Sequence, residues 1–78
     1  MKKWIVEFEE DVITIVNRLH RCSLYINKEE VDFHEGMSVR AFLMGKTTSG
    51  ESVKAFLNVG LTKIHCDLYI DDMTVLKT

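Results

Sequence analysis

The sequence predicts an all-β fold, a small antiparallel sandwich or barrel of about eight short strands. Apolar and polar residues alternate along several short runs, most clearly from residue 62 to residue 70, and this period of two is typical of half-buried strands. Polar turns separate the runs, and the sequence of one strand occurs in two similar copies. The chain contains no proline, so every backbone amide is available to a sheet hydrogen-bond ladder.

The repeated strand indicates that one domain, residues 1–78, is built from two related halves, approximately residues 1–36 and 37–78. Its copies are Cys22-Ser23-Leu24-Tyr25-Ile26 and Cys66-Asp67-Leu68-Tyr69-Ile70, and a valine follows each copy at the same distance. Alternate side chains of a strand share a face. Because 78 residues leave room for a single core, we predict that the Cys, Leu and Ile side chains of both copies meet in one interior.

The first half is predicted to consist of short strands joined by polar turns. Residues 3–9 alternate, with Trp4, Val6 and Phe8 on one face. The run Val12-Ile13-Thr14-Ile15-Val16 is β-branched throughout, which favours a strand because branched side chains lose rotamer freedom in a helix. The repeated strand follows, Asn27-Lys28-Glu29-Glu30 is expected to turn the chain, and residues 31–33 return as a short strand.

The second half opens with an echo of its own. Ser38-Val39-Arg40-Ala41-Phe42-Leu43 reappears as Ser52-Val53-Lys54-Ala55-Phe56-Leu57, and a loop of residues 45–51 lies between them. Two matched apolar runs around a loop rich in Gly, Ser and Thr are typical of a hairpin. The second copy of the repeated strand follows over residues 62–70, Asp71-Asp72 turns the chain, and residues 73–76 form the last strand.

An α+β fold is the alternative, and it explains the repeat equally well. Short helices at residues 11–19 and 51–59 would pack on a small antiparallel sheet, so that each half reads as helix, strand and hairpin. Apolar residues between Val12 and Leu19 fall at helical spacing, with Asp11 in a position to cap the helix. The unbroken β-branched run favours the strand.

Composition argues against several classes of function. The formal net charge is −2, which disfavours a nucleic-acid binder that relies on neutralising phosphates. No run of apolar residues is long enough to span a membrane, and acidic residues soon follow Lys2 and Lys3, unlike the pattern of a secretory signal. We therefore expect a cytoplasmic protein with neither a membrane nor a nucleic-acid partner, in which Cys22 and Cys66 stay reduced.

Histidine and cysteine raise two chemical hypotheses. A zinc site needs three or four converging ligands, whereas His65 and the adjacent Cys66 would point to opposite faces of one strand. Cys22 or Cys66 as a nucleophile, with His20, His34 or His65 as the base, is the hypothesis for a hydrolase. A cysteine within an apolar strand face is hidden from substrate, so we expect no metal, no cofactor and no enzymatic activity.

The opening Trp4-x-Val6 and the paired acidic turns resemble the β-sandwich of the Fas apoptotic inhibitory molecule family. This resemblance implies a β-sandwich fold. The glycines of that family's hairpin turns are absent from this sequence, so no function is transferred from it.

The candidate functional surface lies opposite the predicted core. Tyr25 and Tyr69 fall on the outward side of the repeated strands, where a partly exposed ring can contact a partner. The predicted ligand or partner surface consists of Tyr25, Tyr69, Arg21, Arg40, Lys54, Lys63 and His65.

Such a mixed aromatic and basic surface predicts a small non-enzymatic binding domain that acts through protein–protein contact or self-association as a homodimer. The alternative is a sponge or sensor for a nucleotide or another small anion stacked on tyrosine. A cysteine-dependent hydrolase is the third and least favoured hypothesis.

Overall fold

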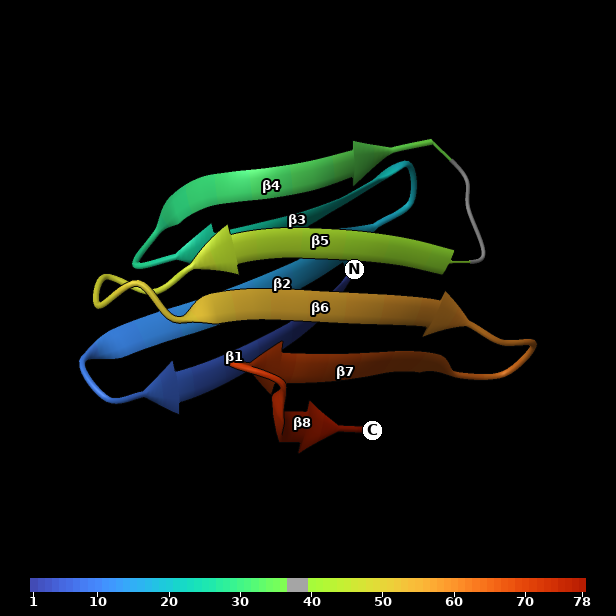
Figure 1. Ribbon diagram of the computed structural model, residues 1–78. Helices are drawn as coiled ribbons and strands as arrows, with labels where there is room; N and C mark the ends of the chain where they lie inside the picture. The colour runs from blue at the N-terminus through green and yellow to red at the C-terminus, as the bar shows by residue number, and fades with distance from the viewer. Residues whose placement is uncertain (37–39) are drawn as a thin grey trace.

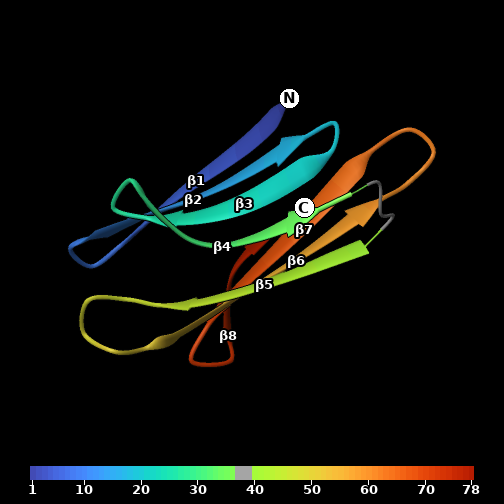
Figure 2. The same ribbon diagram turned by 90° about the horizontal axis from the view of Figure 1, so that it is seen from above.

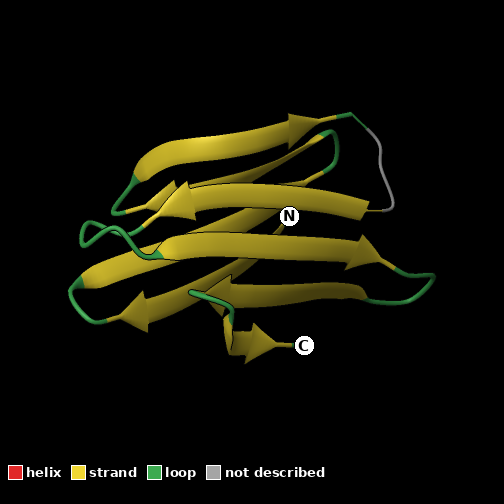
Figure 3. Cartoon of the chain, in the orientation of Figure 1, coloured by secondary structure: helices red, strands yellow, loops and turns green. Residues whose placement is uncertain are grey.

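Eight antiparallel strands form two sheets. The computed structural model describes residues 1–36 and 40–78. Strands β1–β4 make one four-stranded sheet and β5–β8 make another, each in sequence order (Figure 1). The described residues contain no helix (Figure 3), so the all-β prediction is confirmed and the α+β alternative is wrong. The strands are β1 (Lys2–Phe8), β2 (Asp11–Arg18), β3 (Arg21–Ile26), β4 (Glu29–Glu35), β5 (Arg40–Lys46), β6 (Ser52–Val59), β7 (Ile64–Ile70) and β8 (Met73–Lys77).

Both segments that the sequence left open between strand and helix are strands. Strand β2 pairs with β1 and β3, and β6 pairs with β5 and β7, so each has a neighbour on both sides. Ile13 and Ile15 alternate into the core, whereas Val12 and Leu19, which a helix would have buried with them, are exposed. Period-two burial and β-branched side chains therefore outweighed the helical spacing.

The two sheets pack face to face as a sandwich (Figure 2). Both copies of the repeated strand point their Cys, Leu and Ile side chains into one buried cluster, as predicted. None of these six side chains is more than 5% exposed, and burial of each Leu or Ile contributes about 1.5–3 kcal/mol. The sandwich form of the prediction is therefore confirmed, with Cys22, Leu24, Ile26, Cys66, Leu68 and Ile70 in the interior.

The duplication extends to the tight turns at residues 27–28 and 71–72. All four turn residues have positive φ, between 47° and 72°, which matches the type I′ turn that suits the twist of paired strands. Neither turn contains glycine, and Asn and Asp supply the left-handed conformation instead. Each half also carries a register shift at the same place in its repeated strand, after Leu24 and after Leu68.

The same hydrogen bonds attach the first turn to β2 and the second turn to β6. The Asn27 amide donates to the Val12 carbonyl oxygen, and the Val12 amide donates to Asn27 Oδ1, both over 2.9 Å. In the second half the Asp71 amide donates to the Ser52 carbonyl oxygen, and the Ser52 amide donates to Asp71 Oδ1, again over 2.9 Å. A side chain with an acceptor oxygen is therefore needed at the first turn position in each half.

Strands β4 and β5 join the two sheets along one side of the sandwich. The Met44 amide donates to Asp32 Oδ2 over 2.8 Å. A Cβ atom at Gly45 would lie 2.8 Å from Cγ2 of Val31, so this position needs glycine for the close approach of the two sheets. Gly45 thus belongs to strand β5, although the sequence placed it in the following loop.

Asp11 ties the first sheet to the loop between β5 and β6. Its carboxylate accepts hydrogen bonds from the Thr48 amide over 3.0 Å and from Asn27 Nδ2 over 2.7 Å. These bonds, with the one from Asn27 the strongest, hold the pKa of Asp11 below its ordinary value. The predicted β5–β6 hairpin is confirmed, while Ser38 and Val39 of the predicted echo lie outside the described residues. Within residues 1–36 and 40–78, no helix is long and apolar enough to cross a membrane.

Candidate binding surface

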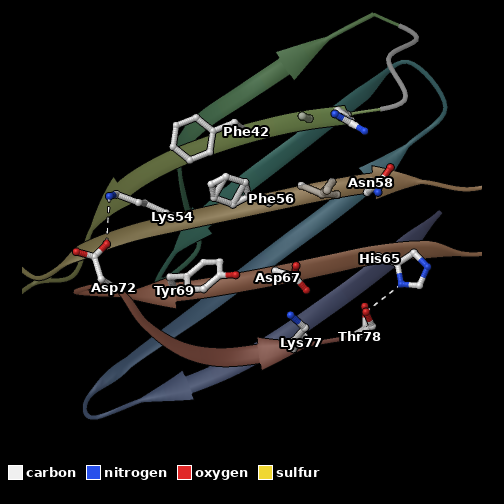
Figure 4. Close-up of a pocket in the computed structure, with 13 residues that line it drawn as sticks. Phe42, Lys54, Phe56, Asn58, His65, Asp67, Tyr69, Asp72, Lys77 and Thr78 are labelled. Atoms are coloured by element: carbon white, nitrogen blue, oxygen red, sulfur yellow. Dashed lines mark hydrogen bonds and ion pairs between the residues drawn. The ribbon is translucent and has the colours of Figure 1, made fainter.

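The outer face of the second sheet is hollowed. Side chains from all four of its strands line an open depression of about 800 Å³, which we call the groove (Figure 4). These side chains point away from the core because they alternate with the buried residues of β5, β6 and β7. The two meander sheets are built alike, so the groove results from the side chains on this face rather than from the topology.

A row of aromatic rings crosses the groove from strand to strand. Phe42 and Phe56 are register partners on β5 and β6, and their ring centroids lie 4.6 Å apart at a tilt of 34°. Phe56 meets Tyr69 of β7 edge to face, with 5.8 Å between centroids. Phe42 is 47% exposed and Phe56 is 43% exposed. The row therefore presents apolar rings to solvent, held in place by their contacts with one another.

Polar contacts lie at the two ends of the groove, on either side of the aromatic row. At one end Lys54 Nζ lies 3.2 Å from Asp72 Oδ1, an exposed ion pair of a kind that contributes about 0–1 kcal/mol. At the other end His65 Nδ1 lies 2.9 Å from the Thr78 carbonyl oxygen. Figure 4 shows these pairs on opposite sides of the rings. The groove thus has an apolar centre and a polar rim.

Asp67 brings a carboxylate into the groove between the aromatic row and β8. Its register partners are Phe56 on β6 and Lys77 on β8. Asp67 Oδ1 is buried and has no hydrogen-bond partner, and no ion pair within 4.0 Å joins Asp67 to Lys77. A buried acceptor without a donor loses its hydration without replacement, so this carboxylate lowers the stability of the fold.

The outer face of the first sheet is covered in part by its own Arg21 side chain, although Phe33 stays 48% exposed and Ile5 61% exposed. The Arg21 guanidinium lies 3.9 Å from the centroid of the Phe33 ring. It also pairs with the carboxylates of Glu30 at 2.7 Å and Glu35 at 3.3 Å. A cation–π contact and two ion pairs on one planar guanidinium hold this side chain flat over the sheet.

Beneath this cover, Val16 is only 3% exposed and Ser23 is fully buried. Ser23 Oγ makes no hydrogen bond of ordinary geometry. The Ser23 hydroxyl beside Glu30 and, after it, the Arg21 guanidinium nevertheless hold the pKa of that carboxyl below its ordinary value. The outward side of the first repeated strand is therefore occupied by side chains of its own sheet.

The structure divides the predicted surface residues between three places. The groove gathers Tyr69, Arg40, Lys54 and His65. Arg21 and Tyr25 lie on the first sheet, and Lys63 lies in the loop between β6 and β7. Both tyrosines are half-buried, as expected. Sequence reasoning missed Phe42, Phe56, Asp67 and Lys77 as lining residues. Aligning the β5–β6 echo as an antiparallel hairpin could have placed the two phenylalanines side by side.

Both cysteines are buried, free thiols. Burial raises the pKa of Cys22, whose Sγ donates to the His34 carbonyl oxygen over 3.8 Å, and it raises the pKa of Cys66 to about 12. A thiol needs a lowered pKa to act as a nucleophile near neutral pH. A second hollow of about 590 Å³ reaches Cys22. Among the described residues, no three His, Cys, Asp or Glu side chains lie close enough together to hold a metal ion.

No protein-family model, curated protein or solved structure matches this chain. The likeness to the Fas apoptotic inhibitory molecule family is therefore a resemblance in strand and turn features. The β-sandwich that this resemblance implied is observed.

Proposed function

We propose that this protein is a small non-enzymatic binding domain that recognises a protein partner through the groove on the second sheet. The observation that carries the proposal is the aromatic row of Phe42, Phe56 and Tyr69, presented half-exposed on a rigid sheet. Aromatic side chains in the centre of a patch, surrounded by polar groups, are the usual anatomy of a protein–protein hot spot.

The rings are already ordered before any partner arrives. Each ring packs on a neighbour, and the sheet below them is fixed by a fully buried core that includes Ala55 and Leu68. Binding then requires little ordering of side chains, which is one of the main entropic costs of association. A partner that covers the exposed parts of Phe42 and Phe56 would gain apolar burial at about 25 cal/mol per Å².

A small anionic ligand is the second candidate function. The volume of the groove, about 800 Å³, falls in the ordinary range of small-molecule sites, and Arg40 and Lys54 line it. However, Lys54 is already paired with Asp72, and the Asp67 carboxylate would repel a phosphate placed beside Tyr69. These charges favour a protein partner over a nucleotide.

A second copy of the chain is one form that the partner can take, which makes a homodimer part of the proposal. Sedimentation equilibrium over a wide concentration range tests it, and a monomer throughout would rule out self-association while leaving a different protein partner. The cysteines support a binding role rather than hydrolysis because burial raises both thiol pKa values. Free buried thiols also support the proposed cytoplasmic location.

Selection from a random peptide display library tests the proposal. We expect enriched peptides to bind the wild-type protein and to lose about tenfold or more in affinity on Phe56→Thr, which removes the central ring. Ile5→Thr is the matched control, since Ile5 is 61% exposed on an outward position of the first sheet. Failure to enrich any peptide, or equal binding to all three proteins, would contradict the proposal.

A further inference from the structure

In only one of the two related halves is a carboxylate beside an aromatic ring paired with an arginine of the same sheet. In the first sheet the chain itself supplies a cation. The Arg21 guanidinium stacks on Phe33 at 3.9 Å and pairs with Glu30 at 2.7 Å. Planar, delocalised and weakly hydrated, a guanidinium suits such a site better than the compact, strongly hydrated ammonium of lysine. The first half is therefore an intramolecular example of how this sandwich binds an arginine side chain on its outer face.

The second sheet lacks that guanidinium, and its aromatic rings and carboxylate stand at other positions, since Lys77 and Thr74 are the counterparts of Phe33 and Glu30. The repeated strand places His65 where the first half has Arg21, and Asp67 where it has Ser23. His65 is engaged at its Nδ1 by the Thr78 carbonyl oxygen. Asp67 Oδ1 is buried without a partner, and the rings of Phe56 and Tyr69 line the same groove.

We propose that the groove accepts an arginine side chain of the partner protein, with its guanidinium over the aromatic row and donating to Asp67. The inference rests on the proposed function and names the chemistry of that partner. Stacking on a ring contributes about 0.5–1 kcal/mol at exposed sites. A charge-assisted bond to the Asp67 carboxylate would offset its lost hydration and fix the orientation of the guanidinium.

The other charged groups around the groove leave Asp67 open to such a ligand. Lys54 is neutralised by Asp72 at 3.2 Å. Lys77 is the register partner of Asp67 on the short final strand, and no ion pair within 4.0 Å joins them. Arg40 lies at the start of β5, and the Phe42–Phe56 pair stands between Arg40 and Lys54 along the two strands. Lys77 is therefore the chain's own competitor for this carboxylate, and its removal should strengthen arginine binding.

Titration of the full chain with short capped peptides, followed by amide chemical shifts, tests the inference. The probes are Ac-Ser-Gly-Arg-Gly-Ser-NH₂ and the same peptide with citrulline, which keeps the planar shape and removes the charge. We expect saturable shifts in β6 and β7 with the arginine peptide. The citrulline peptide should bind with an affinity lower by about tenfold or more. Asp67→Asn should reduce arginine binding to the citrulline level, whereas Glu7→Gln, at an exposed position of the first sheet, should retain it.

Asp67→Ser is the second variant, since the first half shows that this place accepts serine, and thermal unfolding checks that each variant is folded. Equal binding of the two peptides, or arginine binding that survives both changes at Asp67, would overturn the inference. Shifts confined to the first sheet would also overturn it. Display-selected peptides that need Phe56 but contain no arginine would refute the arginine while leaving the groove as a protein-binding surface.

Discussion

The two halves of this sandwich share a repeated strand inside and differ outside. In the core, Leu24 and Leu68 occupy equivalent places, and both are fully buried. On the outward side, Val16 is 3% exposed beneath Arg21, whereas its counterpart Phe56 is 43% exposed in the groove. The interior is constrained in both halves by the same close packing. The outer faces carry no such constraint, and their side chains differ between the halves.

The largest expected effect tests the likeness of the two interiors. Leu24→Ala and Leu68→Ala should each lower the free energy of unfolding by about 2–5 kcal/mol, because each leaves a cavity between the sheets. Urea denaturation of the two variants measures the losses. Nearly equal values are expected, and a small loss for one beside a large loss for the other would show that the cores are not equivalent.

Exchanging residues between the outer faces tests their difference. Ser23→Asp should lower the free energy of unfolding by about 1–3 kcal/mol, because it buries a second carboxylate beside Glu30. Asp67→Ser should raise it by about 1 kcal/mol or less, because it removes a carboxylate oxygen that has no donor. Thermal unfolding of both variants measures the changes.

Opposite signs for the two exchanges are the expected result. If Asp67→Ser lowered the free energy of unfolding, Asp67 would contribute to folding. Its presence in the groove would then not indicate a residue retained for binding at the expense of stability.

The paired turns allow a smaller test. Lys28 and Asp72 have φ of 72° and 64°, and glycine adopts this region without strain. Lys28→Gly should therefore raise the free energy of unfolding by about 0.5–1 kcal/mol. Asp72→Gly should raise it less, since it also breaks the ion pair with Lys54. Denaturant midpoints check both variants, and a loss of stability for Lys28→Gly would contradict the type I′ assignment.

Acid should weaken the link between the first sheet and the β5–β6 loop. The pKa of Asp11 is lowered in the folded protein, mainly by the Asn27 amide group and then by the Thr48 backbone amide. Its stabilising contribution is therefore complete well above about 3.9, the ordinary pKa of Asp, and is lost as the pH falls through the lowered folded value. Melting temperatures from neutral pH down to strong acid should show the wild-type advantage over Asp11→Asn shrinking in that window. A constant difference would exclude this role for the charge.

The sequence was sufficient for the strands because the evidence for them is local. Alternation along residues 64–70 and the β-branched run from Val12 to Val16 each determine a strand without knowledge of its neighbours. The repeat then indicated one interior for both halves. Placing Gly45 in a loop was an error, because its role depends on Val31, a residue of the other sheet.

The groove was only partly predictable because it depends on pairing. Tyr25 and Tyr69 look identical in the sequence, yet only Tyr69 stands beside an exposed phenylalanine, which reaches it through the β6–β7 register. The cover of the first sheet likewise requires β4 to bring Phe33 beneath Arg21. Alternation tells which face a side chain occupies, but not what lies next to it on the neighbouring strand.

The bond between Asp32 and Met44 has a consequence for how this protein behaves when concentrated. Strand β5 is the first strand of its sheet and forms one of its edges, and such an edge exposes amide groups on which a foreign strand can assemble. Here one of those amides already donates to Asp32 Oδ2 at 2.8 Å. An incoming strand would have to displace this carboxylate and leave its charge beside the new backbone. Asp32 thus occupies one of the edge amides on which a foreign strand would have to assemble.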